Sequence, residues 1–172
     1  MNRYTIVIGI LAVIVVAVIF GNVSCTDQSS KDYTQTIKSD STDASYNKVN
    51  VYNNRGLIYA ALGQYQEAIH DYNQAIELNP TDMNAYYNRG LSWFKLGEYK
   101  QAIWNHKRVI EFGRGDSDVY FSRGLANEML GKYIYALSDF DQALRLDSSN
   151  VLARSGKIRV NQILRDEKRQ IE

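Results

Sequence analysis

The sequence predicts an all-α protein, built as a solenoid of helix-turn-helix repeats behind an apolar N-terminal helix. Three observations predict this fold. Residues recur every 34 positions from Val49 onward, small and apolar residues within each repeat keep helical spacing, and a glycine separates the two helical halves. The repeats occupy residues 49–82, 83–116 and 117–150, called units 1, 2 and 3 below. Residues 151–172 are expected to form a capping helix.

Residues 1–25 contain the apolar helix, which is either a membrane anchor or an export signal. No polar side chain occurs from Ile6 to Phe20, and the twenty residues from Tyr4 to Val23 suffice to cross a hydrocarbon core of ~30 Å. A short positive start before such a run also has the form of a secretory signal. An uncleaved transmembrane helix and a cleaved signal therefore both stay open.

The end of this segment adds a third alternative. Val23-Ser24-Cys25 resembles the end of a bacterial lipoprotein signal, although Asn22 stands where that signal prefers Leu, Val or Ile. Cys25 is therefore a lipidation candidate. Basic residues on the two sides of the apolar run nearly balance, so the orientation is only weakly encoded. Because the lipoprotein and the signal alternatives both export the chain, we expect the repeats to be membrane-anchored and extracytoplasmic, in the periplasm or at the cell surface.

Residues 26–48 are predicted to be a flexible tether. Ser, Thr and Asp make up 13 of these 23 residues, and the few apolar side chains keep neither helical nor strand spacing. Such a segment cannot bury enough surface to offset its ordering entropy. As a coil it would span roughly 25–30 Å, which holds a folded domain just clear of a membrane surface.

Seven columns of residues keep the 34-residue spacing through all three units. They are Tyr52, Tyr86 and Tyr120; Arg55, Arg89 and Arg123; Gly56, Gly90 and Gly124; Leu62, Leu96 and Leu130; Gly63, Gly97 and Gly131; Tyr65, Tyr99 and Tyr133; and Ala68, Ala102 and Ala136. The period and these residues resemble the tetratricopeptide repeat (TPR), over residues 49–150. The resemblance implies a right-handed solenoid of paired helices.

Unit 1 shows why these residues favour paired helices. Tyr52, Gly56 and Tyr59 share one face of a first helix, which the left-handed conformation open to Gly63 can end. The inner face of the second helix is expected to hold Tyr65, Ala68, Ile69, Tyr72, Ala75 and Ile76. Pro80 stops that helix, and Asp82 is expected to cap the next one.

Each unit departs from the family pattern at one position, where Arg55, Arg89 and Arg123 replace the usual Leu. Asp71 and Asp139 stand on the second helices of units 1 and 3, so we expect partly buried Arg–Asp pairs there, whereas unit 2 offers Asn105. The glycines at 113 and 115 predict a looser junction after unit 2. Asn127 replaces an aromatic residue, which predicts weaker packing in unit 3.

The sequence contains no recognisable catalytic, cofactor-binding or metal-binding motif. One cysteine and two histidines make a structural zinc site unexpected, and the chain lacks a glycine-rich phosphate loop, HExxH and GxSxG. We therefore predict no catalytic residue, no cofactor and no metal, and we do not expect an enzyme. His106 falls in the column of Tyr72 and Phe140, where it is expected to fill an aromatic position in the core.

The resemblance implies a concave groove, lined by the first helices, that holds an extended peptide or a helix of a partner protein. Its expected lining is Asn53, Leu57 and Ala60; Tyr87, Leu91 and Phe94; and Phe121, Leu125 and Glu128. The three aromatic residues are candidate anchors unless packing within the array covers them. Some family members clamp the terminal carboxylate of chaperone tails here with Lys and Asn. This chain has Asn53, Leu57, Asp118 and Ser122 instead, which argues against that specificity.

Two functions stay open. The first is a membrane-tethered adaptor that binds a partner protein in the groove, and the second is a structural module that self-associates end to end. RNA binding is disfavoured because residues 50–150 carry ten basic and twelve acidic residues. The segment 151–172 carries six basic and three acidic residues, which predicts a solvated cap or, alternatively, a docking patch for an anionic partner or lipid.

Overall fold

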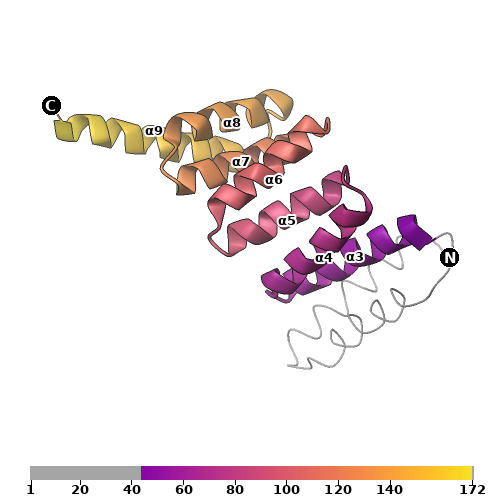
Figure 1. Cartoon of the computed structure of the whole chain (residues 1–172). Coiled ribbons are helices and arrows are strands. Elements are labelled where there is room, and N and C mark those ends of the chain that lie inside the picture. Colours follow the sequence, from indigo (N-terminus) through magenta and orange to yellow (C-terminus); the bar gives the residue numbers. More distant parts are fainter. Residues whose placement is uncertain (1–43, 172) are drawn as a thin grey trace, which may run out of the picture.

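The computed structural model describes residues 44–171, with side chains from Lys48 onward, as a succession of seven α-helices (Figure 1). Their bounds are α3 Ala44–Ala61, α4 Tyr65–Leu78, α5 Met83–Lys95, α6 Tyr99–Glu111, α7 Ser117–Met129, α8 Tyr133–Leu146 and α9 Val151–Ile171. The described part contains no strand, which confirms the all-α prediction. Between residues 44 and 171 no helix combines the length and apolar character needed to span a membrane.

Several predictions for the N-terminal part lie outside the described residues. These are the apolar helix of residues 1–25, the lipidation of Cys25 and the tether up to residue 43. The end of the predicted tether needs a correction, because α3 begins at Ala44 and residues 44–48 are helical. These five residues have no counterpart in the repeat, so the 34-residue spacing alone could not place the helix start.

The helices pair as the repeat predicts, α3 with α4, α5 with α6, and α7 with α8, and α9 packs on α8 and α7. Gly63 ends the first helix of unit 1 with φ of +76°, and Gly97 and Gly131 repeat this geometry at +80° and +69°. A side chain is strained at such φ values, which is why glycine recurs in this column.

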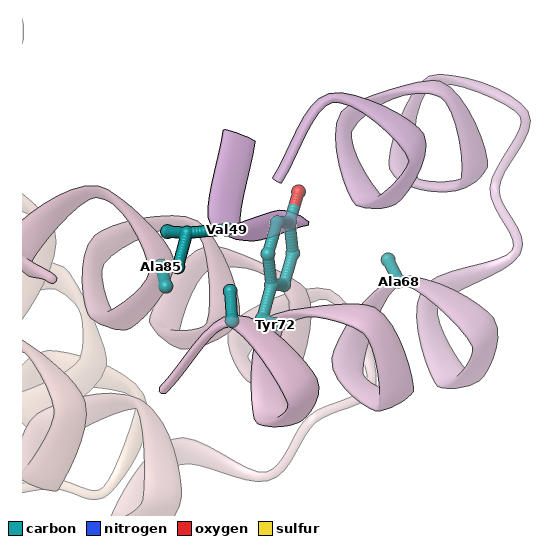
Figure 2. Close-up of a cluster of buried hydrophobic side chains, with 5 residues drawn as sticks. Val49, Ala68, Tyr72 and Ala85 are labelled. Carbon is teal, nitrogen blue, oxygen red and sulfur yellow. The ribbon is translucent and has the colours of Figure 1, made fainter. Parts of the chain in front are cut away.

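Close contact within each pair depends on the Gly56 column. A Cβ atom added at Gly56 would lie 2.7 Å from the ring of Tyr72, so only glycine lets α3 and α4 approach this closely. Figure 2 shows Tyr72 between Ala68 on one side and Val49 with Ala85 on the other. Ala85 belongs to α5, so the same cluster joins unit 1 to unit 2.

The predicted arginine pairs in units 1 and 3 are confirmed. Arg55 binds Asp71 through two nitrogen atoms, and Arg123 binds Asp139 with N···O distances of 3.0 and 2.5 Å. In unit 2, Arg89 donates instead to two amide oxygens, at 2.8 Å to Asn105 on α6 and at 2.6 Å to Asn73 on α4. Each of these arginines thus ties a first helix to a second helix.

Unit 3 and the junction before it contain polar links that the sequence did not predict. Asn127 is buried and donates to Asp139 at 3.0 Å, so it joins the Arg123–Asp139 pair in place of packing as an aromatic residue. At the α6–α7 junction, Arg114 binds Asp116 at 2.8 Å and Asn84 on α5 at 3.0 Å. The glycine-containing junction is therefore bridged by one side chain.

Candidate partner-binding face

The first helices α3, α5, α7 and α9 form one side of the array. Each contacts the next first helix directly, whereas no comparable contact joins consecutive second helices in the described part of the chain. An array whose first helices lie closer together than its second helices curves toward the first helices. The inner face of the first helices is therefore the candidate binding surface, called the inner face below.

The nine predicted groove residues differ in how far solvent reaches them. Leu57 is the most open, with 46% of its surface exposed. Asn53 is buried, and the Glu128 side chain is only 9% exposed. The other members are half-buried, namely Ala60, Tyr87, Leu91, Phe94, Phe121 and Leu125.

Packing within the array partly covers the three aromatic residues of this set. Each ring contacts a ring on the second helix of its own unit, with centroid distances of 5.6 Å for Tyr87 and His106, 5.3 Å for Phe94 and Tyr99, and 6.0 Å for Phe121 and Phe140. Rings held in this way have few rotamers to lose on binding, so they offer a rigid apolar surface.

Tyr87 lies at the centre of the inner face and has polar neighbours on two sides. The guanidinium of Arg114 lies 4.9 Å from its ring centroid, and its hydroxyl makes a hydrogen bond with Ser122 on α7. Burial raises the pKa of Tyr87, while the hydrogen bond from Ser122 opposes that rise. The hydroxyl thus stays protonated at neutral pH, and it can donate a hydrogen bond.

The ring of His106 packs against Tyr87 on the side that faces the core. It is fully buried, which confirms its predicted place in the core, and it lies against Gly90 where Tyr72 and Phe140 lie in the other units. Neither ring nitrogen has a hydrogen-bond partner among the described residues. Burial, and secondarily the charge of Arg123, lower the pKa of His106 to about 4. The imidazole is therefore neutral at pH 7.

Polar bonds close the two ends of the inner face. Asn53 donates to Asp82, the N-cap of α5, at 2.6 Å. Glu128 accepts two hydrogen bonds from Arg159 of α9, at 2.5 and 2.7 Å, and this contact raises the pKa of Arg159. Both predicted residues thus have partners within the chain, which leaves the middle of the inner face as its most apolar part.

Two functional neighbours were missed at the sequence level, Arg114 and Arg159. Arg159 could have been found, because it follows Leu125 by 34 residues and so continues the groove column onto α9. Arg114 shares its column with Pro80 and Ser148, which are not basic, so no spacing pointed to it. Among residues 44–171 no cluster of His, Cys, Asp or Glu is arranged to hold a metal ion. The arrangement suits binding through rings, aliphatic side chains and amides.

Comparison with known proteins agrees with this architecture. A family model described as "TPR repeat" matches residues 56–97. The described helices form a TPR solenoid. The first TPR of Spaghetti (RPAP3), bound to the HSP90 peptide SRMEEVD, is similar with a TM-score of 0.67 and 26% identity, over 69% of this chain and 94% of that one.

Two further structures share the fold. The TPR domain of Arabidopsis OM64 has a TM-score of 0.64 and 27% identity, over 66% of this chain and 94% of that one. MamA has a TM-score of 0.73 and 24% identity, over 83% of this chain and 81% of that one, and at this identity the likeness concerns the TPR fold alone. Curated protein sequences gave no significant match.

Proposed function

We propose that this protein is a membrane-tethered adaptor, which binds a segment of a partner protein along the inner face of its TPR units. The observation that carries the proposal is the set of solvent-accessible residues on successive first helices, from Leu57 through Tyr87 to Leu125, which combines an exposed aliphatic side chain with a pre-packed ring. The peptide-bound TPR of Spaghetti, whose fold this chain resembles, supports binding over catalysis. Membrane attachment rests on residues 1–25 alone.

The chemistry of the inner face favours an apolar segment over an acidic tail. Asp118, in the first turn of α7, is exposed and would repel a carboxylate. Exposed amides of Asn54 and Asn84 lie on the same helices as Leu57 and Tyr87 and can bond to the backbone of an extended peptide. The proposed partner segment therefore presents aliphatic or aromatic side chains and lacks a run of Asp or Glu.

The test compares two leucines of nearly equal exposure. Leu57 on the inner face is 46% exposed, and Leu78 at the end of the second helix α4 is 43% exposed. Leu57→Glu and Leu78→Glu make the same chemical change, and neither removes a core side chain. Each full-length variant is purified from its native membrane beside the wild type, and mass spectrometry quantifies the proteins that co-purify.

A partner lost with Leu57→Glu and retained with Leu78→Glu supports the adaptor function. Equal recovery of every co-purifying protein with both variants contradicts it. If the protein self-associates in place of binding a partner, a tagged copy should recover an untagged copy of this chain. The yield of that recovery should be the same for the wild type and for Leu57→Glu. Tethering is tested separately by membrane fractionation, and lipidation by mass spectrometry of the purified protein, where an added acyl mass that Cys25→Ser abolishes indicates lipidation.

A further inference from the structure

Helix α9 is the first helix of a fourth unit. The N-caps of the preceding first helices, Asp82 and Asp116, each accept a hydrogen bond from the backbone N–H three residues later, at 3.3 and 3.0 Å. Asn150 lies 34 residues after Asp116 and accepts from Ala153 at 2.9 Å. Ala85, Val119 and Ala153 keep the same spacing and are all fully buried.

Gly156 does not keep this 34-residue register and makes a different contact. Gly156 follows Gly124 by 32 residues and is not its counterpart. A Cβ atom at Gly156 would lie 2.7 Å from Phe140, so this glycine lets α9 approach α8 of the preceding unit. The counterpart of Gly124 is Ile158, which points away from that contact and is 65% exposed.

No second helix covers α9 in the part of the chain that the structure describes. In unit 1, α4 covers Val49 and Gly56, and both are buried. Their counterparts on α9 at a distance of 102 residues are Val151 and Ile158, which are 64% and 65% exposed. This uncovered side of α9, which also includes residues 154 and 165, is called the open face below. Figure 1 shows α9 at the edge of the array.

The open face is cationic. Arg154 and Arg165 are exposed on it; Arg154 lies one helical turn before Ile158 and Arg165 two turns after it. Arg154 also donates a hydrogen bond to the backbone carbonyl of Ser148. Over its length α9 carries six basic and two acidic side chains. In unit 1 the second helix supplies a carboxylate to a cation of the first helix, Asp71 to Arg55. The counterpart of Arg55 on α9 is Lys157, whereas Arg154 and Arg165 stand where unit 1 has Tyr52 and Gly63.

We propose that the open face of α9 docks an acidic amphipathic helix of a partner protein, in the place where a second helix would complete unit 4. Val151 and Ile158 supply the apolar contact, and Arg154 and Arg165 pair with carboxylates of the incoming helix. Lys157 does not take part, because it binds Asp141 of α8 at 2.5 Å. The isoleucine side chain at position 158 holds the docked helix farther from α9 than α4 lies from α3.

The chain itself supplies a probe of this chemistry. A peptide of residues 65–78 has the sequence of α4, a helix that docks on a first helix in unit 1. It carries Glu67, Asp71 and Glu77 and no Lys or Arg. Fluorescence anisotropy measures binding of this labelled peptide to the full-length protein in detergent, at two salt concentrations.

We expect saturable binding that weakens at least tenfold with Arg154→Glu combined with Arg165→Glu, and similarly with Ile158→Asp. Lys100→Glu with Lys107→Glu on α6 is the matched control, since it makes the same charge change at exposed sites and should leave binding within twofold. Unchanged helical content by circular dichroism shows that the variants fold.

Three results would overturn the proposal. One is equal loss of binding with the α6 control, which would mean a nonspecific charge effect. Another is loss with Leu57→Glu and not with the α9 variants, which would place the peptide on the inner face. The third is sedimentation showing that wild-type protein dimerises through α9, since a second copy would then be the occupant. Binding that survives Leu57→Glu supports the open face even if the proposed adaptor function fails.

Discussion

Units 2 and 3 have the same backbone plan but different interiors. In unit 3, Arg123 faces a carboxylate, and Phe140 fills the space beside Gly124. In unit 2 the equivalent arginine, Arg89, faces two amide oxygens, and His106 fills the space beside Gly90. Burial lowers the pKa of Arg89, whose hydrogen-bond acceptors are neutral amides and not a carboxylate.

The repeat therefore specifies the shape of the side chain beside each glycine more strictly than its chemistry. A planar ring beside a glycine is required in every unit, but Tyr, His and Phe all satisfy that requirement. A buried imidazole without hydrogen-bond partners is destabilising relative to a phenyl ring of similar shape. Unit 2 should therefore be the less stable unit, although Tyr87 at the centre of the inner face belongs to it.

The largest expected effect comes from removing the ring of unit 3. Phe140 packs between Gly124 of α7 and Gly156 of α9, so Phe140→Ala opens two helix contacts at once. We expect a loss of about 4 kcal/mol in the free energy of unfolding, from burial and cavity terms together. His106→Ala in unit 2 should cost about half as much, because it also removes two unpaired nitrogens. Urea unfolding of both variants measures the difference, and equal losses would contradict the comparison.

Acid should weaken unit 2 through His106. Its pKa is about 4 in the folded protein and ~6.5 in an unfolded chain. Between these values the unfolded state binds more protons, so the free energy of unfolding falls as the pH decreases from 6.5 to 4, by roughly 3 kcal/mol. His106→Phe removes this loss while keeping a ring beside Gly90. The difference in stability between wild type and variant, followed by urea unfolding across this pH range, should grow with acidity. A constant difference would show that His106 does not titrate in this way.

The sequence predicted the solenoid well because its spacing records contacts that recur. Gly56 and Tyr72 mark a contact that every unit makes, so three copies of the pattern revealed it. A contact that occurs only once in the array leaves no repeated pattern in the sequence. Gly156 belongs to one contact with Phe140, and its spacing concealed the true register of α9. For the inner face, the 34-residue spacing placed Tyr87 on the correct helix but could not show that its ring packs against the ring of His106.

Exchanging the arginine partners tests whether charge explains part of the difference between the units. Asn105→Asp gives Arg89 the carboxylate that Arg123 has, and we expect a gain of about 1 kcal/mol. Asp139→Asn leaves Arg123 without its carboxylate partner. Because the Arg123 side chain is 23% exposed, we expect a loss of about 2 kcal/mol in the free energy of unfolding. Thermal unfolding of both variants measures the exchange. A gain of stability from Asp139→Asn, or a loss from Asn105→Asp, would show that these pairs do not stabilise the units.

The smallest expected effect concerns the junction between the two units. Arg114 joins α5 to α7 by binding Asn84 and Asp116, and it lies over the ring of Tyr87. Because its side chain is 33% exposed, Arg114→Gln should cost only about 0.5–1 kcal/mol. Loss of the positive charge should also raise the pKa of Tyr87 further, which ultraviolet titration detects. Arg145→Gln is the control, because Arg145 is exposed and bonds within its own helix to Gln142. If both variants lost the same stability and left the tyrosine titration unchanged, Arg114 would be an ordinary surface residue, and the glycine-containing loop alone would set the junction between unit 2 and unit 3.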